Sequence, residues 1–193
     1  MKLKDYLKQG KQAPPKKQSS TETDWLFVER LTVSSGKLWI GDPEFSWAEC
    51  REKEGCMLTV PNGTYVVEAR GQEFGGPRLV TRLRVVLDGT PEAKLGKEFG
   101  EAGTDSGQLG VCDPKLFLAA LTAACKGDEE RILAALESAF DSECGVYRPQ
   151  RAGAGCLVYV PSGFGDGGGP VWRLCQGRQT VGLETVFIPQ DEA

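Results

Sequence analysis

The chain has 193 residues, of which 40% are hydrophobic and none is histidine, so Ser-His-Asp and Cys-His catalysis are both excluded. Residues 1–18 hold six lysines and one aspartate, a net charge of +5, whereas the rest of the chain carries −9. An odd count of seven cysteines, no secretory signal and no apolar run of 18 residues argue against a disulfide framework and a membrane span, and predict a cytoplasmic chain with reduced thiols.

The start of the chain separates a basic tail from a folded body. Residues 1–23 read as a short helical start followed by a linker rich in Pro, Gln and Ser, and residues 24–193 as a single globular domain. The body opens with two predicted strands at 25–33 and 37–40. An Asp-Pro pair then predicts a short helix over 43–50, because the Asp side chain accepts a backbone N–H and Pro needs none at the first helical position.

The later elements are mostly strands, with two helices between them. We predict strands at 57–60, 64–70, 78–87, 156–160, 171–174 and 180–188, a Gly-rich loop over 90–104, and helices over 115–125 and 129–140. The two helices carry facing apolar stripes, which is typical of a helical hairpin. The fold class is therefore α+β and mainly antiparallel β, a sandwich or open barrel with one helical hairpin over 114–140.

Two phrases of the sequence are echoed later in the chain. Ser-Gly-Lys-Leu-Trp-Ile-Gly-Asp-Pro at 35–43 returns 71 residues on as Ser-Gly-Gln-Leu-Gly-Val-Cys-Asp-Pro at 106–114. Val-Pro-Asn-Gly at 60–63 resembles Val-Pro-Ser-Gly at 160–163. We interpret these echoes as a possible internal duplication, in which the second half carries the helical hairpin as an insertion. The segments 36–43 and 107–114 are then expected to be strand-then-helix units related by an approximate twofold axis.

A Gly-rich stretch at 160–172 encloses one carboxylate, Asp166. Residues 163–168 match the dinucleotide-binding pattern G-x-G-x-x-G, but that motif needs a helix after its last Gly, and here a strand is predicted. The stretch is therefore either a structural crossover or one wall of a site.

The candidate site residues are the polar groups least explained by local structure. Asp42 and Asp113 are interpreted as helix caps and nothing more, whereas Asp105 and Asp166 both lie in Gly-rich turns. The ligand-binding candidates are Asp105, Ser106, Ser162, Asp166, Gly167 and Gly168. We favour a structural role in which Asp166 is buried and accepts backbone N–H groups, over a ligand site in an open cleft with Asp105 in reach. We expect no cofactor and no metal, with Asp105 and Asp166 as the only candidate cation ligands.

With these phrases at 35–43, 105–107 and 162–168, the chain resembles the bacterial family called domain of unknown function 4241. The resemblance covers about residues 25–188. The chain departs from the family pattern before the Pro of the last motif, where the family usually has Tyr and this chain has Gly169. The resemblance implies a bacterial origin but no activity, because the family is uncharacterised.

For function, the sequence favours a non-catalytic binding or interaction module over an enzyme, since the usual nucleophile and base pairings are missing. An immunity-like role with a protein partner is one concrete form of this hypothesis. The alternative is a metal-assisted hydrolase that uses Asp105 and Asp166. We expect no binding to nucleic acid or membrane, because the body is acidic, and the oligomeric state is left open.

Overall fold

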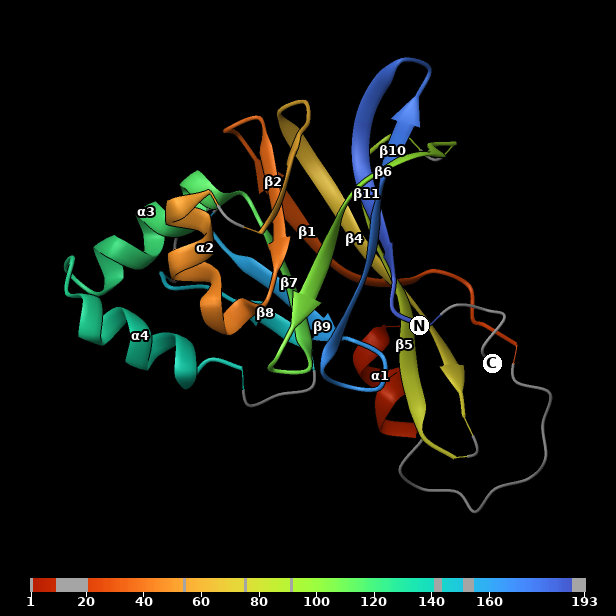
Figure 1. Cartoon of the computed structure of the whole chain (residues 1–193), viewed down its shortest axis with the longest axis horizontal. Helices are drawn as coiled ribbons and strands as arrows, with labels where there is room; N and C mark the ends of the chain where they lie inside the picture. Colours follow the sequence, from red (N-terminus) through yellow and green to blue (C-terminus); the bar gives the residue numbers. More distant parts are fainter. Residues whose placement is uncertain are drawn as a thin grey trace.

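The computed structural model describes residues 2–9, 21–53, 55–74, 76–90, 92–140, 144–150 and 155–188. Two antiparallel sheets form the body (Figure 1). The six-stranded sheet has the order β1 (Leu26–Val33), β4 (Gly63–Glu73), β5 (Arg78–Leu87), β11 (Gln179–Val186), β10 (Gly167–Gln176) and β6 (Lys94–Thr104). The five-stranded sheet has the order β3 (Cys56–Thr59), β2 (Lys37–Gly41), β7 (Gln108–Cys112), β9 (Leu157–Pro161) and β8 (Gly145–Tyr147). The predicted fold class, α+β and mainly antiparallel β, is confirmed.

The two sheets pack on a shared apolar core because their strands alternate in burial. In β4, Tyr65, Val67 and Ala69 are fully buried while Glu68 and Arg70 between them are partly exposed. The core cluster joins such residues from both sheets, for example Val67 and Val85 of one sheet with Val111 of the other. Burial of each large aliphatic side chain contributes about 1.5–3 kcal/mol.

The helices cover the outer side of the five-stranded sheet. A 3-10 turn η1 (Pro43–Phe45) leads into α2 (Ser46–Glu52), and α3 (Pro114–Ala124) and α4 (Glu129–Glu137) form the predicted hairpin beside it (Figure 1). A second apolar cluster fills the space beneath them and includes Trp39, Phe117 and Ile132. No helix among the described residues combines the length and the apolar character that crossing a bilayer requires.

The loop predicted over 90–104 is wrong, because residues 94–104 form β6 at the edge of the six-stranded sheet. The first five residues of β6 are exposed, so the strand lacks the alternation of apolar residues that marks a half-buried strand. Its stability comes from the backbone ladder with β10, which side-chain patterns do not reveal.

The sheets have a pseudo-twofold symmetry that the 71-residue echo predicts. Each strand order is palindromic once β1 to β5 are matched with β6, β7, β9, β10 and β11. Ile40 of β2 pairs with Val111 of β7, its own equivalent, so the local twofold axis passes between them. The first half pairs Val33 with Gly63, and the second half pairs Thr104 with Gly167 in the same way. The expected twofold relation between 36–43 and 107–114 is confirmed.

The other two details of the duplication need correction. The inserted part is α4 with β8, because α3 occupies the place of η1 and α2, directly after the Asp-Pro pair. The Val-Pro echo is out of register by two residues. Val60 donates its N–H to the carbonyl of Gly36, and its structural counterpart is Ser162, which donates to the carbonyl of Gly107.

The N-terminal helix α1 (Leu3–Gln9) belongs to the body. Leu3, Tyr6 and Leu7 are buried in the core cluster, and the ring of Tyr6 lies against Gly71, where a Cβ atom would come within 2.4 Å of it. Residues 3–9 therefore pack with residues 24–188 and do not lie apart as a tail. Of the predicted linker, residues 10–20 fall outside the described residues.

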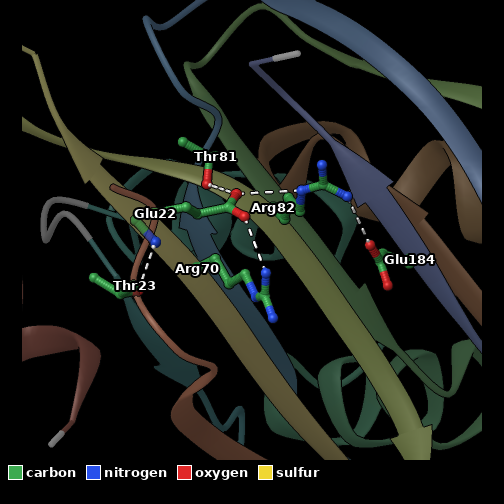
Figure 2. A network of polar contacts seen from close by, with 7 residues as sticks. Glu22, Thr23, Arg70, Thr81, Arg82 and Glu184 are labelled. Carbon is green, nitrogen blue, oxygen red and sulfur yellow. Dashed lines mark hydrogen bonds and ion pairs between the residues drawn. The ribbon is translucent and has the colours of Figure 1, made fainter. Parts of the chain in front are cut away.

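Residues 21–25 are fixed to the outer face of the six-stranded sheet by Glu22 (Figure 2). The side chain of Glu22 is only 5% exposed and accepts hydrogen bonds from Arg70, Thr81 and Arg82, while Arg82 also pairs with Glu184. Burial alone would raise the pKa of Glu22, but the hydrogen bonds from Thr81 and Arg70 and the charges of Arg82 and Arg70 together lower it below 4.5.

We therefore expect Glu22→Gln to destabilise the protein only while the carboxyl of the wild type is ionised. A carboxyl whose pKa is lowered by folding adds stability above its unfolded pKa of 4.5 and loses it as the pH falls through the folded value. At pH 7 the variant should lose about 1–3 kcal/mol of unfolding free energy, because two arginines lose their charged partner. Urea unfolding at neutral and acidic pH measures this. A difference between the two proteins that stays constant down to the lowest pH would contradict it.

Candidate functional site

The turn that holds Asp105 and Ser106 is built around the carboxylate of Asp42, which is 2% exposed. One oxygen accepts from the N–H of Asp105 and the N–H of Ser106, each at 2.9 Å, and from the hydroxyl of Thr104 at 2.8 Å. The other oxygen accepts from the hydroxyl of Ser106 and from the N–H of Glu44, both at 2.9 Å. Asp42 therefore caps η1 and fixes a turn 63 residues away at the same time.

Asp113 does the same for the first half of the chain. One of its oxygens caps α3 through the N–H groups of Lys115 and Leu116, and the other accepts from the N–H groups of Ser34 at 2.7 Å and Ser35 at 2.8 Å. The prediction that these aspartates are helix caps and nothing more is wrong, because each also anchors the turn of the other half. Since both halves repeat the arrangement, we interpret the bond between Ser106 and Asp42 as part of the scaffold.

The hydroxyl of Ser162 also has a structural partner. It donates to the carbonyl of Gly165 at 2.7 Å, while its own N–H donates to the carbonyl of Gly107 at 3.0 Å. These bonds tie the loop before β10 to the Asp105–Gly107 turn. Ser106 and Ser162, both predicted candidates, thus hold the two turns together.

The glycines after Asp166 serve the packing of strand β10. Gly169 is buried, and a Cβ atom there would lie 2.2 Å from the carbonyl oxygen of Val186, so only glycine fits. Gly165, before the strand, has a φ of +122°, which a side chain rarely adopts. The expected strand after the G-x-G-x-x-G match is present, because β10 begins at Gly167, and no helix N-terminus stands there for a pyrophosphate.

Asp105 and Asp166 lie side by side at the end of a strand ladder. Thr104 of β6 pairs with Gly167 of β10, so Asp105 and Asp166 are the next residues on each chain, and both are exposed. The prediction that Asp166 is buried is wrong. The glycines that follow it fit the backbones of neighbouring strands, and the chain places no cover over the carboxylate.

Two hollows flank this pair of carboxylates and share Thr104 and Gly167. One, of about 130 Å³, lies beside Ser162, Phe164, Asp166 and Gly168. The other, of about 370 Å³, lies beside Asp42, Phe45, Glu49 and Asp105. Phe164 and Phe45 are large apolar side chains left 75% and 49% exposed. We call the surface made by Phe45, Glu49, Asp105, Phe164, Asp166, Gly167 and Gly168 the acidic surface.

Four of these seven residues are among the predicted candidates, and three are not. Phe45, Glu49 and Phe164 were missed because nothing local marks them, although a phenylalanine enclosed by glycines at 163–165 is a signal for an exposed ring. Within the described ranges, no three Cys, Asp or Glu side chains are grouped so that they could hold a metal ion. All seven cysteines are free.

Comparison with known proteins adds no relative to this picture. No protein-family model, no curated protein and no solved structure matches the chain.

Proposed function

We propose that this chain is a non-catalytic interaction module and that the acidic surface binds a basic protein partner. The observation that carries the proposal is the exposed pair Asp105 and Asp166 with the phenyl ring of Phe164 beside it. Neither aspartate is needed to hold the turns, because Asp42 and Ser162 do so. Their side chains are free to meet another molecule.

The chemistry of the acidic surface suits a protein partner. Aromatic side chains are enriched at the centres of protein interfaces, where removal of a ring from water contributes most of the affinity. Carboxylates beside such a ring attract lysine and arginine and orient the encounter. The backbone at Gly167 and Gly168 is exposed and carries no side chain, so a partner can approach it closely.

An immunity-like role is the concrete form of this proposal. In such a role, a small acidic protein covers the basic surface of a toxin, and the net charge of −4 favours that encounter. The same charge disfavours nucleic acid, since carboxylates repel phosphate groups. The resemblance to domain of unknown function 4241 and a place in the bacterial cytoplasm, with reduced cysteines, are parts of the same proposal.

Affinity capture with charge-reversed variants tests the proposal. The tagged chain should retain a basic protein in stoichiometric amount from extract of its source cells, and Asp105→Lys/Asp166→Lys should lose it. The matched control, Glu130→Lys/Glu137→Lys, makes the same change of charge at exposed positions on α4 and should retain the partner. Equal retention by both variants, or repeated failure of the wild type to retain any protein, would contradict the proposal.

The alternative of a metal-assisted hydrolase is favoured by one observation, the adjacency of Asp105 and Asp166 at the end of the β6 and β10 ladder. The proposal of an interaction module predicts that titration with Mg²⁺ or Ca²⁺ leaves the melting temperature unchanged, because two exposed carboxylates provide too few ligands. A saturable rise in melting temperature that is lost in Asp166→Asn would favour the hydrolase instead.

A further inference from the structure

Two buried cysteines from different halves of the chain face one another beneath the helices. Cys50 lies on α2 and Cys112 is the last residue of β7, and their sulfur atoms are 3.9 Å apart. Cys50 is 5% exposed and Cys112 is fully buried, and both belong to the cluster that contains Trp39 and Phe117. No other pair of cysteine sulfurs in the described residues is recorded in contact.

We propose that Cys50 and Cys112 are an oxidation site that closes into an internal disulfide. A disulfide has an S–S length of about 2.05 Å, so the sulfur atoms have to approach by about 2 Å. Cys112 is held in place, since its strand pairs with Trp39 on one side and Leu157 on the other. The movement therefore falls to α2, a helix of seven residues that ends at Lys53 in a left-handed conformation with φ +64°.

Hydrogen peroxide is an oxidant that balances the reaction. The sulfur of Cys50, the more exposed of the two, attacks one peroxide oxygen; an S–O bond forms, the O–O bond breaks, and water leaves, which gives a sulfenic acid at Cys50. The sulfur of Cys112 then attacks the sulfur of Cys50, the S–S bond forms, and the S–O bond breaks. The departing hydroxide takes the proton of Cys112 and leaves as a second water. The two thiols lose two electrons, and the peroxide gains them.

The second step is expected to be slow in the folded protein. Burial raises the pKa of the Cys112 thiol well above its usual range, and the hydrogen bond and charge of Cys50 add to this effect. The thiolate is the reactive form, so reaction waits for an opening of α2 and speeds up at alkaline pH. The pair is therefore a slow sensor of sustained oxidation.

Oxidation should stabilise the fold independently of any partner. The bond would close a loop between two residues 62 apart in sequence. Restriction of the unfolded chain by a loop of this length corresponds to a rise in melting temperature of about 10 °C for a protein of this size. Because the readout is thermal, the inference does not depend on the proposed function.

Peptide mapping of the folded, full-length chain tests the inference. After treatment with equimolar hydrogen peroxide and alkylation of the remaining thiols, trypsin should release residues 38–51 joined to residues 98–115, each of which contains a single cysteine. The joined peptides should be two hydrogen atoms lighter than the sum of the two, and a reductant should separate them. The rise in melting temperature should disappear in Cys50→Ser and persist in Cys175→Ser, which replaces the one partly exposed cysteine.

Two results would overturn the inference. One is wild-type protein whose peptides 38–51 and 98–115 stay separate while sulfenic or sulfinic acid accumulates. The other is a joined pair that forms no faster in folded protein than in protein unfolded by urea, because preorganised sulfur atoms must react faster than random ones.

Discussion

Replacement of Asp42 with alanine is expected to lower the free energy of unfolding by about 3–5 kcal/mol, the largest effect of any single polar substitution in this chain. The carboxylate accepts five hydrogen bonds in a site that water does not reach, from Glu44, Thr104, Asp105 and Ser106. Without it, the N–H groups of the Asp105–Gly107 turn lose their acceptor and the turn loses its only attachment to η1. Urea unfolding measures the change.

A matched series of capping aspartates separates this role from helix capping. Asp113→Ala should also cost about 3 kcal/mol or more, since Ser34 and Ser35 depend on it. Asp128 caps α4 through the N–H of Arg131 but is exposed, so Asp128→Ala should cost about 1 kcal/mol. Equal costs at the three positions would show that the contacts between the halves contribute nothing beyond the caps.

Gly169→Ala is expected to cost about 3 kcal/mol or more, because the new methyl group would lie 2.2 Å from the carbonyl oxygen of Val186. That oxygen belongs to the backbone of β11, which is paired between β10 and β5, so it cannot move aside without disturbing both ladders. Thermal unfolding of the variant measures the cost as a fall in melting temperature.

Gly103→Ala is the control for this substitution. Gly103 faces Gly168 across the same ladder, but a Cβ atom there would meet its nearest neighbour at 3.5 Å, an ordinary contact. This variant should change the unfolding free energy by no more than about 0.5 kcal/mol. If both variants lose the same amount, the glycines are conserved in length and not in space by the packing of β10, and our explanation of the Gly-rich run is incorrect.

Local signals in the sequence predicted much of this fold. Alternation in residues such as Tyr65, Val67 and Ala69 marked β4, and Asp-Pro pairs marked the starts of η1 and α3. The echo at a spacing of 71 residues predicted the twofold relation, because a repeated phrase at a fixed spacing adopts the same local structure twice. These are features that neighbouring residues decide among themselves.

The parts that were missed depend on partners far away in the sequence. β6 is a strand because β10 pairs with it, and its own residues are glycines and charges typical of a loop. The second oxygen of Asp42 meets a turn from the other half, which no local pattern shows. The exposure of Asp166 likewise follows from how β10 packs, since its glycines face Ala102 and Val186 and not the carboxylate.

Amide hydrogen exchange on the complex with the captured partner tests the central claim most directly, because it locates the contact surface. The acidic surface predicts slower exchange in the bound protein at residues 43–49 and 163–168, and unchanged exchange in α4 and in β5 on the outer face of the six-stranded sheet. Protection confined to α4 or to β5, with residues 163–168 exchanging as fast as in the free protein, would contradict it.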